Sequence, residues 1–183
     1  MRRAIEVETG SGSFTPGLIC TMTQVHLVQI ETIWQGILRA AQQPDMDWSW
    51  AYKLRLAGSE RRFEAYVVEI DKLAHGVMLL ETEWHRSQLD RQSDRAPLVY
   101  VEYLASAPWN RRVIEDPPYF VRIGQTLLMF ARQRSVELGY GGRVGLHSIA
   151  EAEAFYHRQG MPDYGADLDK DGLVYFEYGN VTQ

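Results

Sequence analysis

Cysteine is nearly absent from this sequence of 183 residues, in which Cys20 is the single example. A disulfide within the chain is therefore excluded, and so is a metal site built from several thiolates. A chain without disulfides is compatible with a reducing cytoplasm, which is the compartment we expect.

The sequence also lacks an excess of positive charge. Nineteen lysines and arginines stand against 24 aspartates and glutamates, which gives a formal net charge of -5 at pH 7. Proteins that bind nucleic acid through its phosphates need clustered cationic residues. We therefore expect no nucleic-acid partner and a protein that handles small molecules or other proteins.

Long apolar runs are missing as well. No segment approaches the roughly 20 apolar residues of a transmembrane helix. The opening MRRAIEVETG has two arginines but no apolar stretch behind them, unlike a secretory signal. These absences predict a soluble, cytoplasmic protein with no membrane partner.

The composition is that of a globular protein. Hydrophobic residues make up 45% of the chain and aromatic residues 11%, which is enough to build a core. The length suits one domain. We expect a strand and linker segment over residues 1–24 and a single domain over residues 25–183.

The N-terminal half predicts short strands and one helix. AIEVE and LICTMT suit strands on either side of the turn-rich GSGSFTPG. Residues 25–42 repeat apolar side chains at helical spacing, namely Leu27, Ile30, Trp34, Ile37, Leu38 and Ala41. PDMDWSWAYK follows as a polar and aromatic connector. FEAYVVEID (63–71) and GVMLLETEW (76–84) predict a hairpin whose turn region is KLAH.

The C-terminal half has an α/β order. LVYVEYLAS (98–106) predicts a strand apolar enough to be covered on both faces, after the polar linker HRSQLDRQSDRAP. GQTLLMFARQRSVELG predicts a helix that Gly139 ends, RVGLHSI a short strand, and LVYFEYG a closing strand. Together these elements predict a mixed α/β sheet with helices on both faces.

A short helix is expected over EAEAFYHRQG. Ser148 stands three residues before Glu151, which is the spacing of a capping box, and Gly160 is placed to end the helix in the left-handed conformation. Phe155 lies on the inner face with Tyr156 at its border. Packing accounts for this aromatic pair unless a site lies in front of Tyr156.

Three segments together resemble the GCN5-related N-acetyltransferase (GNAT) superfamily. They are LVYVEYLASAPWNR, RIGQTLL running into a helix, and AEAFYHRQGM, and the resemblance covers about residues 25–179. It implies a mixed, mostly antiparallel sheet that is splayed after its fourth strand. Acetyl-coenzyme A (acetyl-CoA) is then held in the opening, and an acceptor amine enters from the opposite side.

The loop before the long helix is the expected diphosphate cradle. A loop that feeds a helix N-terminus offers backbone N–H groups and a favourable dipole to a phosphate. The residues at this place are Phe120, Val121, Arg122, Ile123, Gly124, Gln125 and Thr126. Gly124 allows a close approach of the backbone, although a plain loop-to-helix junction is an alternative. The resemblance also implies that the backbone of Leu104, Ala105 and Ser106 binds the pantetheine arm and polarises the acetyl carbonyl.

Two side chains are the expected catalytic residues. Glu102 lies within an apolar strand, where an unpaired carboxylate is costly. The resemblance implies an acid there that takes the proton from the amine, directly or through water, and pairing with an arginine is the alternative. Tyr156 matches a family tyrosine that faces the cofactor sulfur and protonates the departing thiolate, and packing is the alternative.

The chain departs from the family pattern in the diphosphate loop. The family sequence is Gln/Arg-x-x-Gly-x-Gly/Ala, but Tyr119 stands at its first position and Arg122 at its first glycine, and VIEDPP is inserted before the loop. A frequent asparagine is replaced by Ile149. A positive φ at Arg122 would cost of order 1 kcal/mol. Its guanidinium could instead bind a phosphate.

The remaining candidates are aromatic residues and histidines. The aromatic connector and its neighbours suit either the acceptor side or a core or interface, and we favour the latter for Trp48, Trp50, Trp84 and His85. No metal is expected, because the spacing of the histidines suggests no site; those considered are His26, His75 and His147.

The sequence therefore favours an N-acetyltransferase that moves an acetyl group from acetyl-CoA to a small-molecule or peptide amine by direct attack. The main alternative is a non-catalytic coenzyme A or ligand-binding module of the same fold with a degenerate diphosphate loop. A third alternative is an interaction protein whose exposed aromatics bind a partner chain. The identity of the amine and the presence of a homodimer are left open.

Overall fold

The computed structural model describes residues 1–89 and 95–180, and its strands form one mixed sheet in the order β1-β2-β3-β4-β5-β6-β8-β7. Contacts divide the chain into two compact units. Unit 1 holds residues 1–79 and 103–127, and unit 2 holds residues 80–102 and 128–183. β4 (Leu73–Glu81), β5 (Val99–Ser106) and α4 (Ile123–Glu137) each run through both units.

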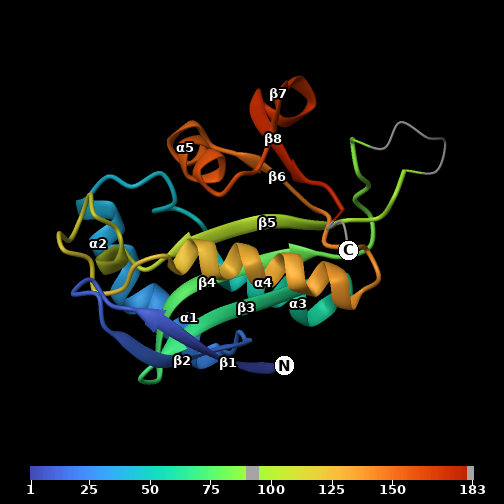
Figure 1. Cartoon of the computed structure of the whole chain (residues 1–183). Coiled ribbons are helices and arrows are strands. Elements are labelled where there is room, and N and C mark those ends of the chain that lie inside the picture. Colours follow the sequence, from blue (N-terminus) through green and yellow to red (C-terminus); the bar gives the residue numbers. More distant parts are fainter. Residues whose placement is uncertain (90–94, 181–183) are drawn as a thin grey trace. The chain divides into compact units, whose positions relative to one another are not determined.

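The N-terminal strands of unit 1 are confirmed. β1 (Arg2–Glu8) pairs antiparallel with β2 (Phe14–Thr21), and β2 pairs with β3 (Phe63–Ile70) (Figure 1). The predicted hairpin between β3 and β4 is also present, but its turn lies elsewhere. Asp71 and Lys72 form the turn with positive φ angles of 50° and 66°, whereas the predicted turn residues after Lys72 already belong to β4.

The helix predicted over residues 25–42 consists of three consecutive segments. They are α1 (Gln24–Gln29), a π-helical turn (Ile30–Trp34) and α2 (Gln35–Ala40). A π-helical turn takes in an extra residue and so rotates the side chains that follow. As a result Leu38 is buried, whereas Ile37, which was expected inside, is 37% exposed.

The aromatic connector contains a helix that the sequence analysis did not predict, α3 (Trp50–Ser59). Ser49 begins it, because its side-chain oxygen accepts a hydrogen bond from the Tyr52 N–H. The buried residues of α3 are Trp50 and Lys53. A lysine on the inner face interrupts the apolar stripe by which helices are recognised in a sequence, which is why the helix was missed.

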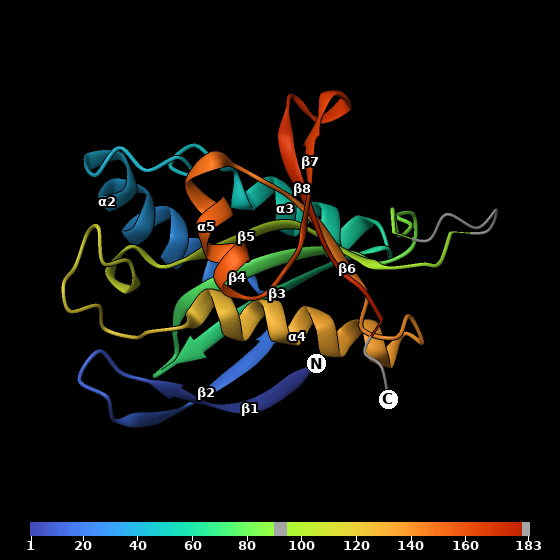
Figure 2. The same ribbon diagram turned by 45° about the horizontal axis from the view of Figure 1, so that its top comes forward.

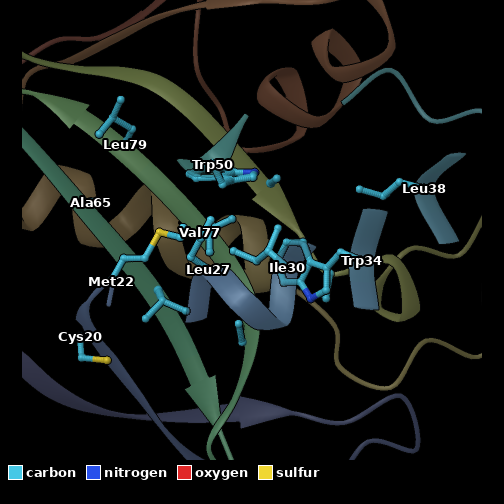
Figure 3. Close-up of a cluster of buried hydrophobic side chains, with 14 of the residues drawn as sticks. Cys20, Met22, Leu27, Ile30, Trp34, Leu38, Trp50, Ala65, Val77 and Leu79 are labelled. Atoms are coloured by element: carbon cyan, nitrogen blue, oxygen red, sulfur yellow. The ribbon is translucent and has the colours of Figure 1, made fainter. Parts of the chain in front are cut away.

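Helices cover both faces of the sheet within unit 1. The helices before β3 and the side chains of β3 and β4 share one hydrophobic core, in which Leu27 lies beside Val77 and Ile30 lies beside Trp34 (Figure 3). The opposite face of β4 carries Gly76 beneath the first turn of α4. A Cβ atom on Gly76 would lie 2.4 Å from Ile123 Cγ2, so the glycine permits α4 to begin close to the sheet.

Unit 2 contains the C-terminal strands. β6 (Val144–Ser148) pairs antiparallel with β8 (Leu173–Tyr178), and β8 pairs with β7 (Asp163–Asp167) (Figure 2). β7 was not predicted, because DYGAD lacks the apolar alternation of a strand. β5 joins β6 in parallel at Val99–Val144 and Tyr100–Gly145 only, within the described ranges, and then continues to Ser106. The predicted mixed, mostly antiparallel sheet is thus confirmed, and the strand whose pairing with β6 ends early is the fifth of the chain, β5, rather than the fourth.

The two helices of the C-terminal half are confirmed, with one correction. α5 (Ala150–Arg158) is followed by Gly160 at a φ of 70°, as expected. The predicted capping box is wrong: Ile149 begins the helix, and the Ser148 hydroxyl donates to the Ile149 carbonyl instead. The buried aromatic of α5 is Tyr156 rather than Phe155. None of the helices in the described part of the chain has both the length and the apolar character needed to cross a bilayer.

Candidate functional site

The loop before α4 is braced by the β1–β2 hairpin. The Val121 N–H donates to the Glu8 carbonyl at 3.0 Å, and the Gly10 N–H donates to the Tyr119 carbonyl at 3.0 Å. These bonds explain what the N-terminal segment does in unit 1. The β1–β2 hairpin holds the loop that precedes α4 in place.

Asn110 fixes the same loop from another direction. Its Oδ1 accepts the Phe120 N–H at 3.0 Å, and its Nδ2 donates to the His75 carbonyl at 3.1 Å. The Trp109 indole N–H donates to His75 Nδ1 at 3.1 Å. Burial lowers the pKa of His75 to about 4, so the ring is neutral at pH 7 and can accept this bond.

The first turn of α4 retains unused hydrogen-bond donors. The N–H groups of Phe120 and Val121 are engaged as described, and the Thr126 N–H donates to the Arg122 carbonyl at 2.9 Å. Three consecutive N–H groups donate to no other residue in ranges 1–89 and 95–180, namely those of Ile123, Gly124 and Gln125. Such donors, aligned with the helix dipole, form a position for an anion.

Arg122 stands at this position in a strained conformation. Its φ is 62°, which is the positive value considered from the sequence, and an arginine there costs of order 1 kcal/mol. The side chain is 69% exposed, and Nη1 lies 3.2 Å from Glu8 Oε2. This buried carboxylate oxygen accepts no hydrogen bond from the described residues, so the contact is an ion pair without hydrogen-bond alignment.

The end of β5 lies close to the start of α4 within unit 1. A Cβ atom on Gly76 would lie 2.4 Å from Ile123 Cγ2 and 3.6 Å from the Ala105 carbonyl oxygen. Gly76 thus allows two of the predicted cofactor-binding segments, residues 104–106 and 120–126, to approach each other.

The backbone donors of β5 point in two directions. The Ala107 N–H donates to the His75 carbonyl of β4 at 2.9 Å. Because successive N–H groups of a strand point to opposite edges, the Ala105 N–H also faces β4. The N–H groups of Leu104 and Ser106 therefore point away from β4.

Arg111 ties the α2–α3 connector to the end of β5. Its two terminal nitrogens donate to the Asp45 carboxylate at 2.7 and 2.6 Å, and Nη2 also donates to the Ser106 carbonyl at 2.7 Å. The Arg111 and Asp45 side chains are only 15% and 9% exposed. A buried two-point ion pair of this kind fixes the connector firmly.

The connector aromatics occupy different environments. Trp50 is buried in the core of unit 1, and Trp48 packs edge-to-face on Tyr103 with ring centroids 5.0 Å apart. These contacts fit the core role favoured from the sequence. Trp84, in unit 2, is 67% exposed.

Tyr156 lies in unit 2 with its ring buried against Phe155 and Phe176, at centroid distances of 5.0 and 5.5 Å. Burial raises the pKa of Tyr156 to about 12, so the phenol is protonated at neutral pH. Its hydroxyl makes no hydrogen bond to another residue in the described ranges. The hydroxyl oxygen is nevertheless not fully buried. The hydroxyl therefore reaches the molecular surface.

Glu102 contacts a histidine rather than an arginine. Its Oε1 lies 3.7 Å from His85 Nε2, and the His85 ring stacks on Tyr100 with centroids 3.8 Å apart. The Tyr100 hydroxyl is 2.6 Å from His147 Nδ1, and His147 Nε2 is 3.0 Å from Asp167 Oδ2. No sequence motif marks this network, because its members are separated along the chain and only strand pairing brings them together.

Three potential metal ligands also lie close together in unit 1. Ligand atoms of Cys20, His26 and Glu69 lie within 4.8 Å of one another, which the sequence spacing did not indicate. The Thr23 N–H donates to His26 Nδ1 at 3.1 Å, so the ring proton sits on Nε2, which donates to Glu69 Oε2 at 2.9 Å. Because both ring nitrogens are engaged, we assign no metal to this cluster.

Comparison with known proteins identifies the fold. No family model and no curated protein matches the sequence. Among solved structures, NAA60 of Arabidopsis thaliana in complex with acetyl-CoA is 14% identical with a TM-score of 0.60, covering 88% of this chain and 97% of that one. A GNAT-family acetyltransferase of Listeria monocytogenes 4b F2365 is 14% identical with a TM-score of 0.58, covering 95% and 99%. The chain has the GNAT fold.

A third GNAT-fold structure, the PaiA N-acetyltransferase of Thermoplasma acidophilum in complex with coenzyme A, is 12% identical with a TM-score of 0.57 and covers 88% of this chain and 97% of that one. In the GNAT fold of the present chain, residues 104–106 follow the last β5–β6 pair, and residues 120–126 comprise the end of the preceding loop and the first turn of α4. Glu102 and Tyr156 both belong to unit 2.

Proposed function

We propose that this GNAT-fold protein is an acetyl-CoA-dependent N-acetyltransferase whose acceptor is a small-molecule or peptide amine. The observation that carries the proposal is the set of unused N–H groups over residues 123–125 at the start of α4. Backbone donors at a helix N-terminus suit a diphosphate. The NAA60 and PaiA structures, which hold acetyl-CoA and coenzyme A, support this choice of ligand.

In this proposal the diphosphate binds the first turn of α4. Phe120 and Val121 shape the loop, because their own N–H groups are already engaged by Asn110 and Glu8. Arg122, whose guanidinium is largely exposed, leaves Glu8 and contacts a phosphate, which is a strong charge-assisted bond.

The pantetheine arm and the acetyl group lie along the end of β5. The N–H groups of Leu104 and Ser106, which point away from β4, provide donors for the arm and for the acetyl carbonyl, while the Ala105 N–H faces β4 as the Ala107 N–H does. The neutral amine attacks the thioester carbon, the C–N bond forms and the C–S bond breaks. A backbone N–H stabilises the oxyanion, Glu102 or a water accepts the amine proton, and Tyr156 donates to the departing thiolate.

One observation favours a second candidate, a non-catalytic coenzyme A or ligand-binding module. The Glu8 carboxylate lies beside the anion position, 3.2 Å from Arg122, where a negative charge opposes a diphosphate. In that case the fold and the cradle persist while productive binding is lost.

Two measurements separate these candidates. Thermal unfolding with acetyl-CoA at about 100 times its dissociation constant should stabilise either form by about 2.7 kcal/mol, which raises the melting temperature by roughly 5–10 °C. A thiol-release assay across a panel of small amines and peptide N-termini should then show turnover for the enzyme. Stabilisation without turnover would favour the binding module, and neither effect would contradict both.

A further inference from the structure

The chain segment after β4 is held rigidly around a buried carboxylate. Glu81 is fully buried, and its two carboxylate oxygens accept the backbone N–H groups of three successive residues, Glu83, Trp84 and His85, at 2.9–3.1 Å. A carboxylate satisfied in this way fixes the backbone that surrounds it. The position of His85 is therefore set before any ligand binds.

The imidazole ring of His85 is fixed as well. It lies parallel to the Tyr100 ring, with an interplanar angle of 13°. Tyr100 is in turn held through its hydroxyl by His147, which Asp167 holds from the other side. Burial lowers the pKa of His147, so this ring is neutral and accepts the Tyr100 proton in a hydrogen bond.

The groups around the His85 ring include one accessible carboxylate. Glu102 Oε1 lies 3.7 Å from Nε2, and the two side chains are 29% and 30% exposed, so both can be reached from outside. Tyr100 stacks on the ring, and Arg86 Nη1 donates to the backbone carbonyls of Glu83 and His85, at 2.5 and 2.9 Å, rather than contacting the ring. The carboxylate of Glu81 is occupied by backbone N–H groups. Glu102 is thus the carboxylate that lies against the ring.

We propose that His85 accepts the proton of the acceptor amine and that Glu102 stabilises the imidazolium that forms. This inference rests on the proposed acetyltransferase function and divides between two residues a step first assigned to Glu102. An imidazole is in general a better proton acceptor near pH 7 than a carboxylate, because its basicity lies closer to the working pH.

The proposed reaction transfers two protons from the nitrogen of the acceptor. The ammonium form of the acceptor gives one proton to His85 Nε2 and becomes a neutral amine. The amine then forms the C–N bond and the C–S bond breaks. The second proton of the nitrogen passes to solvent, and solvent returns one proton to the thiolate, to which Tyr156 donates a hydrogen bond, so that the thiolate becomes a thiol. His85 then returns its proton to solvent, so that one proton is released for each amide and thiol formed.

The test compares turnover as a function of pH for the parent, His85→Ala, His85→Gln and Glu102→Gln, with and without added imidazole. His85→Ala should lower kcat by about 10²-fold or more, and free imidazole should restore part of it in a saturable manner. Glu102→Gln should lower kcat less and keep the acidic limb of the pH profile, whereas His85→Gln should lose that limb. His157→Gln is the matched control, because His157 lies 3.6 Å from Asp163 and is half exposed, and it should leave turnover unchanged.

The outcomes distinguish this inference from the function on which it rests. Parental turnover in both His85 variants, or a loss that is equal at every pH and unaffected by imidazole, overturns the role of His85 and leaves the acetyltransferase standing. If His85→Ala does not fold, His85→Gln decides by its pH profile. A folded parent that binds acetyl-CoA but acetylates no amine overturns both proposals.

Discussion

Tyr156→Phe is the substitution that tests the departing-thiolate step most directly. It removes the hydroxyl and keeps the ring that packs on Phe176. The hydroxyl makes no hydrogen bond to a described residue, so the free energy of unfolding should change by less than about 0.5 kcal/mol. A change in turnover can then be attributed to chemistry rather than to folding.

The pKa of Tyr156 sets the size of the expected effect. Burial raises it to about 12, which is roughly 3.5 units above an ordinary thiol, so complete proton transfer to the thiolate is uphill by about 5 kcal/mol. Tyr156 therefore acts mainly by donating a hydrogen bond to the sulfur while solvent supplies the proton. A hydrogen bond to a charged group is worth about 1.5–3 kcal/mol, which predicts a loss in kcat of roughly 10- to 150-fold.

The assay is thiol release with the best amine, beside the acetyl-CoA affinity of parent and variant. Affinity should barely change while kcat falls, because the interaction forms only as the C–S bond breaks. Tyr140→Phe is the control: its hydroxyl donates to the Thr82 carbonyl at 2.8 Å, so it should lose about 1 kcal/mol of stability and no turnover. Full turnover in Tyr156→Phe would refute the reasoning and leave Tyr156 as a packing residue.

Four further outcomes are expected. Gly124→Val should weaken coenzyme A binding, measured by calorimetry, without changing the melting temperature. Unchanged affinity would show that the diphosphate does not bind at the first turn of α4. Arg122→Ala should bind coenzyme A more weakly and with a smaller salt dependence. Arg122→Gly also relieves the strain of the φ of 62°, and tighter coenzyme A binding by this variant would show that the arginine obstructs the site. The pKa of His75 falls to about 4 on folding, so the unfolded chain binds more protons than the folded one between pH 4 and about 6.5. Stability measured by urea unfolding should therefore fall as the pH drops through this window, and His75→Gln should reduce that fall. Arg111→Ala leaves the buried Asp45 unpaired and should cost about 3 kcal/mol in urea unfolding; a loss below about 1 kcal/mol would show that water replaces the pair.

The sequence by itself determined most of the strands and the long helix. β-branched alternation in β3 and β5 and the regular apolar spacing of α4 are local signals that packing reinforces, so they survive in the structure. The likeness to GNAT proteins likewise came from ordered local segments. Elements without such a signal were missed: α3 carries a buried Lys53, and β7 forms only because β8 pairs with it.

Tertiary structure alone decided how the loop residues are used. From the sequence every N–H over residues 120–126 was a candidate donor, but those of Phe120 and Val121 are taken by Asn110 and by the N-terminal hairpin. Which donors remain depends on partners far away in the chain, and no periodicity records such partners.

The partner of Glu102 was also decided in three dimensions. Its position in an apolar strand showed that a partner or a site was needed, because an isolated carboxylate is costly to bury. That partner is His85, held by the backbone wrapped around Glu81 and by the stack on Tyr100. The need for a partner is a property of one residue and its neighbours, whereas the identity of the partner follows from strand pairing and backbone turns that the folded chain alone defines.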